Sequence, residues 1–157
     1  MKRKQEGQVL VFVALVLLFL VPLIFAMVEI GARIQRGHEL DIALSETTRS
    51  VVQSFRYQKF AANGQELQSQ YQVAALANQL LLINLRNVSG LAKSPYEIAQ
   101  LVHWEIYPNG GTCADGVVSP SGVPLVCATL DAPMHSLTGV GDWTRHSEAS
   151  AVIDQLR

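Results

Sequence analysis

The chain has 157 residues and a formal net charge of −1, with 49 % hydrophobic and 16 % charged residues. A chain of this length makes one domain with room for an appended segment, and its low, balanced charge excludes the basic surface of a nucleic-acid-binding protein. The apolar residues are unevenly spread, because residues 9–28 contain no charged side chain.

That uncharged run is long enough to cross a membrane. Its 20 residues would span about 30 Å as a helix, which is the thickness of a bilayer core. A secretory signal peptide has a shorter apolar region of roughly 7–15 residues. The length therefore favours a retained transmembrane helix, formed by residues 8–28, and disfavours a cleaved signal peptide. Pro22 lies inside the run and leaves two interpretations open, a kinked anchor or a local melting point of the helix.

Basic residues on both sides of the run predict its orientation. Three precede it at positions 2–4, whereas Arg33 and Arg36 follow it. Because positive residues tend to stay on the cytoplasmic side, this excess favours a cytoplasmic N-terminus and an extracytoplasmic remainder. We therefore expect a single-pass protein of the cell membrane.

The next segment has the apolar spacing of an amphipathic helix. One stripe contains Ile30, Ile34, Leu40, Leu44, Val51 and Phe55, with Ala43, Thr47 and Thr48 beside it. Asn63-Gly64 is the first clear stop signal after Pro22, so the pattern predicts helix from about residue 8 to about residue 61, with residues 29–61 as an extended stem. Glu29 and Arg33 are spaced for an ion pair where the helix leaves the membrane.

A second helical pattern follows the stop signal. Its apolar stripe contains Leu67, Tyr71, Ala74, Leu81, Leu85 and Val88. Two packings stay open: this helix folds back on the first as a hairpin, or it packs only on the distal part of the chain. Gly90 and Ser94-Pro95 end the pattern.

The distal region has the alternation of β-strands. Strand candidates are residues 101–107, 123–130 and 147–153, and turns at residues 108–111 and 119–122 separate the first two. In the first candidate, Val102, Trp104 and Ile106 share one face, whereas His103 and Glu105 share the other. Together with the helices, this predicts an α+β fold in which residues 62–157 form an extracytoplasmic domain with a small antiparallel sheet.

Cys113 and Cys127 are the only cysteines. Outside the cytoplasm they are expected to form a disulfide, which a chain-entropy model values at about 3 kcal/mol for a loop of this size. Two free thiols and half a metal site are the alternatives. A metal site is disfavoured because the sequence has no Cys-x-x-Cys and no histidine cluster near the cysteines.

Catalytic motifs are scarce. The histidines at positions 38, 103, 135 and 146 are scattered without ligand spacing. Ser136, Asp142 and His146 could be written as a triad, but no nucleophile motif surrounds the serine, and the chain has no phosphate-binding glycine loop. We therefore expect no enzymatic activity, no cofactor and no metal.

Two short segments resemble the N-terminal region of the TadE/TadG-like proteins of the tight-adherence (Flp) pilus system. Residues 7–15 read GQVLVFVAL, and residues 28–33 read VEIGAR, where Glu29, Gly31 and Arg33 match the acidic residue, glycine and arginine that end the family's membrane helix. The resemblance covers about 30 residues. It implies a pilin-like architecture and a structural role as a minor pilin or pseudopilin-like component, with other pilus or pseudopilin subunits as partners.

The resemblance also raises the question of a cleaved leader. In such proteins a prepilin peptidase cuts after a glycine, which here implies removal of residues 1–7 after Gly7 and a new N-terminus at Gln8. Cleaved pilins carry a glutamate five residues into the mature chain, but this chain has Phe12 there. In this respect it is similar to the TadG side of the family, which keeps an uncleaved anchor, and residues 1–7 would then be a cytoplasmic tail that sets topology.

The alternative to a pilus component is a membrane-tethered binding module. Its extracytoplasmic domain would present the sheet to a ligand or partner, and the N-terminal helix would serve only as an anchor.

Overall fold

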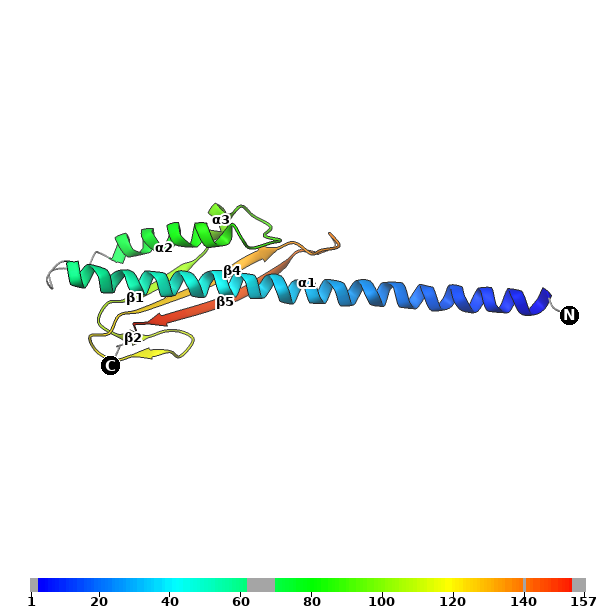
Figure 1. Cartoon of the computed structure of the whole chain (residues 1–157), viewed down its shortest axis with the longest axis horizontal. Coiled ribbons are helices and arrows are strands. Elements are labelled where there is room, and N and C mark those ends of the chain that lie inside the picture. The colour runs from blue at the N-terminus through cyan, green and yellow to red at the C-terminus, as the bar shows by residue number, and fades with distance from the viewer. Residues whose placement is uncertain (1–2, 62–69, 140, 154–157) are drawn as a thin grey trace.

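The structure is a computed structural model that describes the backbone of residues 3–61, 70–139 and 141–153, and the side chains of residues 9–55, 72–139 and 141–153. Its dominant element is α1 (Arg3–Ala61), a helix of 59 residues that extends far beyond the rest of the molecule (Figure 1). The helix continues through Pro22, so the interpretation of a melted segment there is not supported. The helix is described as far as Ala61, and the predicted stop at Asn63-Gly64 lies outside the described residues.

A second helix, α2 (Gln70–Leu85), runs back along the C-terminal half of α1, so the two form an antiparallel hairpin (Figure 1). Asn84 Nδ2 donates to Thr47 Oγ1 (2.8 Å) across the hairpin. The indole Nε1 of Trp104 donates to Asn78 Oδ1 (2.8 Å), which ties α2 to the sheet as well. The hairpin packing is thus the correct alternative, and contact with the sheet accompanies it.

A short helix, α3 (Pro95–Ala99), was not predicted. The Ser94 hydroxyl accepts a hydrogen bond from the Glu97 N–H, and the Glu97 carboxylate accepts one from the Ser94 N–H, which completes a capping box. The proline at its first position suits a helix start, because the missing N–H has no partner there anyway. Ser94-Pro95 therefore begins a helix rather than only ending the preceding one.

The main sheet has three antiparallel strands in the order β1 (His103–Tyr107), β4 (Leu125–Met134) and β5 (Trp143–Val152). Strands β2 (Gly111–Thr112) and β3 (Val118–Ser119) form a separate small ribbon. The α+β class, the long N-terminal helix, the second helix and the small antiparallel sheet are all as predicted. Strands β4 and β5 each have ten residues and are longer than the sequence indicated.

The extension of β4 passes through Pro133, where the predicted strand had already ended. The Pro133 carbonyl accepts a hydrogen bond from the Ala92 N–H (2.9 Å) on the side away from β5. A residue's nitrogen and carbonyl face the same side of a strand, so the missing N–H of this proline removes no bond to β5. Proline is tolerated because β1 pairs only with the first half of β4.

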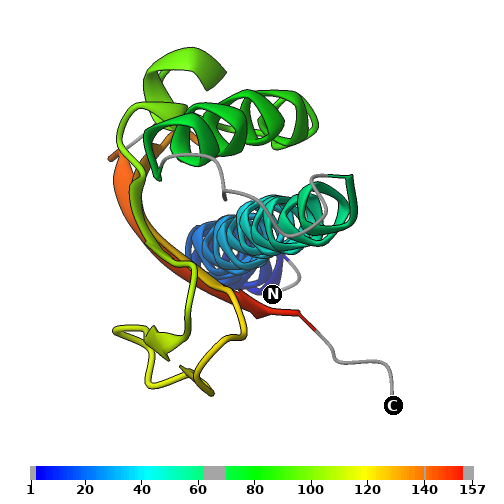
Figure 2. The ribbon, with the colours of Figure 1, turned by 90° about the vertical axis from the view of Figure 1, so that its left-hand side faces the viewer.

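The sheet curves around α1, and both long helices lie on its concave side (Figure 2). Strands β4 and β5 contact α1, while β1 contacts α2. Strand β1 alternates as expected: Trp104 and Ile106 pack under the helices, and Glu105 contacts His103 on the opposite face. We call this helix–sheet assembly, residues 37–153, the head.

The core of the head is built on the predicted stripe of α1, but only on part of it. Leu40, Leu44, Val51 and Phe55 are at most 2 % exposed, whereas Ile30 is 59 % and Ile34 is 69 % exposed. Ile30 and Ile34, which the sequence placed near the same stripe, therefore lie outside the core.

The buried row of α2 also differs from the predicted one. Its members recur every four residues and are Val73, Ala77, Leu81 and Leu85. The prediction had the last two correct but placed Ala74, which is half-buried, in the row. Val88 lies beyond the end of α2, and Leu67 and the Tyr71 side chain lie outside what the structure describes.

Candidate functional site

The N-terminal half of α1 has the properties of a membrane-spanning helix. The large apolar side chains of residues 9–28 are between 41 and 73 % exposed, and the most apolar window contains no buried residue. In the described part of the chain this is the one helix long and apolar enough to cross a membrane. Length and composition are thus those of a single-pass anchor.

Glu29 is the first charged residue after this run, and it binds the far end of the sheet. We call the described residues of the connection between β4 and β5, 135–139 and 141–142, the hairpin tip. Glu29 accepts hydrogen bonds from the backbone N–H groups of Leu137 (2.9 Å) and Thr138 (3.2 Å), and its other oxygen accepts one from Arg33 Nε (2.8 Å). The predicted Glu29–Arg33 ion pair is present, and the carboxylate also holds the tip.

These contacts determine the protonation of Glu29. The hydrogen bond from Arg33 is the largest influence and lowers the pKa of Glu29 below its ordinary value. Desolvation comes second and acts in the opposite direction, and the hydrogen bonds from the Thr138 and Leu137 N–H groups lower the pKa further. The Glu29 side chain is 13 % exposed and that of Arg33 is 39 % exposed. The carboxylate therefore stays ionised at neutral pH and keeps accepting hydrogen bonds from the tip.

Arg36 secures the tip from the next turn of the helix. Its Nη1 donates to the His135 carbonyl (2.8 Å), and the His135 N–H donates to the Gly90 carbonyl (2.8 Å). Gly90 has φ +74°, and a Cβ there would lie 2.7 Å from the Arg36 side chain. Glycine at position 90 therefore leaves the space through which the arginine reaches the tip.

Two more acids of α1 bind the head. Asp41 accepts hydrogen bonds from Arg145 Nη2 (2.6 Å) and Ser147 Oγ (2.6 Å) of β5. Glu39 accepts from the backbone N–H (3.0 Å) and hydroxyl (2.8 Å) of Ser89, and these bonds lower its pKa. Glu29, Glu39 and Asp41 thus join residues 29–41 of α1 to segments that lie 50 to 109 residues later in the chain.

Sequence reasoning identified Glu29 and Arg33 but missed the roles of Arg36, Glu39 and Asp41. The sequence feature that could have indicated these roles is that Glu39 and Asp41 flank Leu40, which is buried. Charged residues beside a buried stripe need a partner, but their partners come from distant segments that no local pattern connects to α1.

The remaining predicted residues of the N-terminal region have less structural context. Gly7 and Gln8 lie in α1, their side chains are outside the described set, and cleavage between them stays a prediction. Gly31 is exposed, and a Cβ there would meet no atom within 4 Å. No packing in the described structure therefore requires glycine at position 31.

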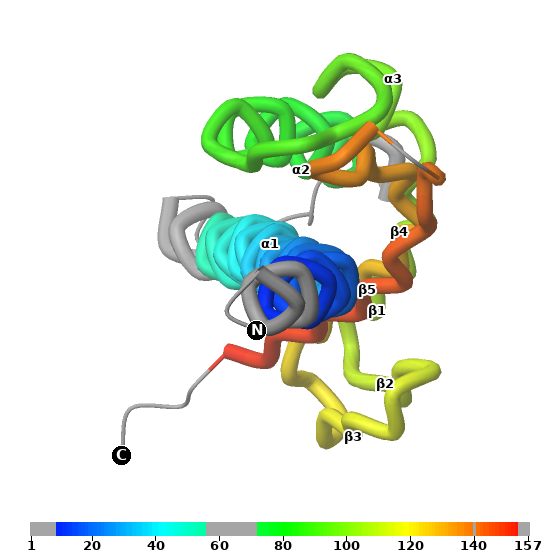
Figure 3. The backbone as a smooth tube through the Cα atoms, turned by 90° about the vertical axis from the view of Figure 1, so that its right-hand side faces the viewer, coloured from blue at the N-terminus to red at the C-terminus, as the bar shows by residue number. Residues whose placement is uncertain are grey.

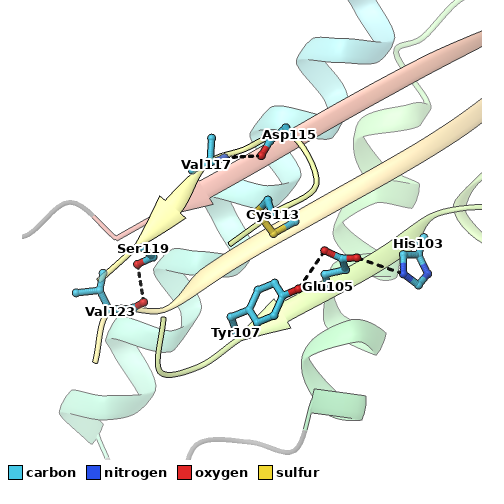
Figure 4. Close-up of a disulfide and its surroundings, with 9 residues drawn as sticks. His103, Glu105, Tyr107, Cys113, Asp115, Val117, Ser119 and Val123 are labelled. Atoms are coloured by element: carbon cyan, nitrogen blue, oxygen red, sulfur yellow. Dashed lines mark hydrogen bonds and ion pairs between the residues drawn. A yellow bond between two sulfur atoms is a disulfide. The ribbon is translucent and has the colours of Figure 1, made fainter. Parts of the chain in front are cut away.

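At the opposite end of the head, Cys113 and Cys127 form the predicted disulfide, with their Cα atoms 5.8 Å apart (Figure 4). It joins the β2–β3 ribbon to the outer face of β4, which is the face away from the helices (Figure 3). Both cysteines are 5 % exposed and pack with Leu125, Tyr107 and Val152. The disulfide is structural because it closes a small buried cluster.

The β2–β3 ribbon depends on one glycine. Gly110 has φ +89°, and a Cβ there would collide with the Pro120 carbonyl. Ser119 Oγ donates to the Val123 carbonyl (2.7 Å), and Asp115 accepts from the Val117 N–H (3.0 Å), which fixes the ribbon's two turns (Figure 4).

The residues of the hypothetical triad have other partners. His146 contacts Asp131 (2.7 Å) and Glu148 (2.9 Å), and these carboxylates, Asp131 first, raise its pKa. Asp142 contacts His135 (2.9 Å). The structure shows no hydrogen bond among Ser136, Asp142 and His146 themselves, within the residues it describes.

Other binding features are limited. An open hollow between α2 and α3 is lined by Asn78, Gln79, Leu82, Tyr96, Ala99 and Gln100. Tyrosine is the one titratable side chain in this lining, which offers little for acid–base chemistry. Where side chains are described, no group of three or more histidine, cysteine, aspartate or glutamate residues is arranged so that it could hold a metal ion.

No protein-family model matches the chain, and comparison with curated proteins and with solved structures likewise finds no match.

Proposed function

We propose that this chain is a structural component of a cell-envelope pilus assembly, a minor pilin or pseudopilin-like subunit held in the membrane by α1. The observation that carries the proposal is the division of α1 into a bare apolar half, residues 9–28, and a half that is the spine of an α+β head. The resemblance of residues 7–15 and 28–33 to TadE/TadG-like proteins agrees with this division.

In this proposal the N-terminus is cytoplasmic and the head is extracytoplasmic. The three basic residues at positions 2–4 favour that orientation. The Cys113–Cys127 disulfide supports it, because disulfides persist in oxidising compartments and are rare in the cytosol.

Phe12 favours a subunit that stays in the membrane. A carboxylate in the apolar part of the helix would be costly to leave in the bilayer unless it were paired with another subunit. Residues 9–28 contain no such charge, so nothing in this segment draws the helix out of the bilayer. We therefore place the protein among the anchored components of the assembly.

Partners in the assembly would find an apolar surface just outside the membrane. Ile30 and Ile34 lie one helical turn apart, are 59 and 69 % exposed, and belong to neither of the clusters that form the head core. Such side chains suit contact with a helix of another subunit. The role is accordingly one of assembly rather than catalysis.

The proposal is tested by the intact mass of the membrane-extracted protein together with the proteins that co-purify with it. We expect co-purification with pilus or pseudopilin subunits, and Ile34→Asp should reduce it. Ile83→Asp is the matched control, because Ile83 is similarly exposed (57 %) but lies on α2. A chain that never co-purifies with such subunits would instead be the membrane-tethered binding module.

The same mass measurement decides the leader question. Loss of residues 1–7 with Gln8 as the new N-terminus would identify a processed subunit, and Gly7→Leu should then block the cleavage. Gly31→Leu is the control, because a side chain at position 31 meets open space. An intact mass that retains residues 1–7 would identify the uncleaved anchor instead.

A further inference from the structure

The hairpin tip lies at the level where the uncharged run of α1 ends. The run stops at residue 28, and the carboxylate of Glu29 directly binds the backbone N–H groups of Leu137 and Thr138. Figure 1 shows the connection between β4 and β5 reaching further along α1 toward the N-terminus than any other part of the head. With residues 9–28 in a bilayer, the tip is therefore within one side-chain length of the membrane boundary.

At this level the tip exposes a large apolar side chain. Leu137 is 50 % exposed and belongs to none of the hydrophobic clusters that the described residues form. A single exposed leucine is ordinary on a water-facing surface. Leu137 differs because the hydrogen bond from its own backbone to Glu29 fixes it beside the end of the apolar run.

An arginine beside the tip is of the kind that lies at membrane–water interfaces. Trp143 begins β5 directly after the tip, and the guanidinium of Arg33 lies 5.8 Å from the centre of its ring. Arginine can lie along apolar surface with its charge in the polar layer. Arg33 therefore suits the depth at which Glu29 holds the tip, whereas Trp143 packs against the core of the head with its Nε1 buried.

We infer that the hairpin tip is a second contact of this protein with the lipid bilayer, in which Leu137 inserts into the interface beside the exit of α1. The inference rests on the membrane anchoring in the proposed function and is independent of the pilus role. A single helix leaves a head free to rotate about the helix axis. A second contact would fix which face of the head is presented to other molecules.

The charges around the tip indicate that apolar contact dominates this interaction. Glu29 and Asp142 are balanced by Arg33 and Arg36, all within contacts of the tip. With no excess of positive charge, attraction to anionic lipid adds little. Insertion of Leu137 is therefore expected in vesicles of phosphatidylcholine alone.

The test uses the full chain in phosphatidylcholine vesicles with a polarity-sensitive fluorophore on one introduced cysteine. The variants are Leu137→Cys, Leu18→Cys in the apolar half of α1, and Val118→Cys in the β2–β3 ribbon. Leu18 and Val118 are 67 and 65 % exposed, so all three labels attach to accessible positions. The native cysteines are joined to each other and do not compete for the label.

Lipids that carry a nitroxide at a known depth in the bilayer then quench nearby labels, and the pattern of quenching gives the depth of each label. We expect the label at position 137 to be quenched more by a nitroxide near the headgroup than by a deep one, consistent with insertion of about 5–10 Å into the interface. The label at position 18 should show the opposite preference, and the label at position 118 should be quenched by neither.

A label at position 137 that is as accessible to water as the one at 118 would overturn the inference while leaving the anchor intact. A label that is shielded from water but not quenched by lipid nitroxides would also overturn it, because a protein chain would then cover the tip. Failure to quench the label at position 18 would overturn the anchor itself, and the tip contact with it.

Discussion

Residues 9–28 and residues 37–55 belong to one uninterrupted helix and are both rich in apolar side chains, yet they have opposite surroundings. In the first segment every large apolar side chain is exposed, whereas in the second Leu40, Leu44 and Phe55 are fully or almost fully buried under the sheet and α2. The two segments differ in pattern: the first is apolar on all sides, and the second only on one stripe. A helix that is apolar on every side needs lipid or other helices around it, whereas a striped one needs a single partner.

The largest difference between the two segments should appear when the same residue type is truncated in each. Leu44→Ala in the buried segment should lower the free energy of unfolding of the head by about 2–5 kcal/mol, because it leaves a cavity. Leu18→Ala in the exposed segment should change it by less than about 0.5 kcal/mol. Urea unfolding of the head in detergent micelles measures both. Equal losses would contradict the division of α1.

A second test loosens the head without touching α1. Replacing both cysteines, Cys113→Ser with Cys127→Ser, should lower the free energy of unfolding of the head by about 3 kcal/mol in the chain-entropy model, since the cross-link joins residues 14 apart. Protection of backbone amides at residues 37–55 from hydrogen exchange should fall accordingly, while protection at residues 9–28 in the micelle should stay unchanged. An equal loss of amide protection in residues 37–55 and in residues 9–28 would show that the two segments are not stabilised separately.

A third test removes one of the acids that attach α1 to the head. Asp41→Ala leaves the hydroxyl of Ser147, which is 2 % exposed, without its acceptor and should lower the free energy of unfolding by about 1–3 kcal/mol. Glu46→Ala is the control, since Glu46 is an exposed acid of the same helix and its loss should change the stability by under about 0.5 kcal/mol. Thermal unfolding of both variants makes the comparison, and equal effects would rule out a structural role of Asp41.

The smallest effect is expected at the boundary between the two segments. Because the pKa of Glu29 is lowered in the folded protein, its ionised form stabilises the tip above the ordinary carboxyl pKa. This contribution is lost as the pH falls through the lowered value. Hydrogen exchange of the Leu137 and Thr138 amides, corrected for the intrinsic pH dependence, should accelerate in that range.

Glu29→Gln should weaken the protection of these two amides at neutral pH, where the native protein keeps it. Glu46→Gln is the control and should leave both amides unchanged. Protection that is the same in native protein and Glu29→Gln at every pH would show that the carboxylate does not hold the tip.

Local patterns were sufficient for the elements whose surroundings repeat along the chain. The spacing of Leu40, Leu44, Val51 and Phe55 predicted the buried face of α1, and the alternation of Trp104 and Ile106 predicted the inner face of β1. In both cases one layer covers the element along its length, so side-chain periodicity maps directly onto burial.

The periodicity of apolar residues could not indicate which parts of α1 are covered by other elements and which are not. Ile30 and Ile34 were placed near the stripe of α1 and yet are exposed, although Glu29 and Arg33 of the same turns contact the hairpin tip and Trp143. Only the tertiary structure shows which side of the helix is covered there. The attachment of the hairpin tip to Glu29 was equally beyond local reasoning, since its donors are 108 and 109 residues away in sequence. The predicted ion pair with Arg33 was correct but described only half of what that carboxylate binds.

The most direct test of the central claim is alkaline carbonate extraction of membranes that contain the full-length protein. If residues 9–28 are a retained transmembrane helix, the chain stays in the membrane pellet and its mass includes that segment. Release of a soluble chain that lacks residues 1–30 would contradict the account, because the exposed apolar half of α1 would then be a removable signal and not an anchor.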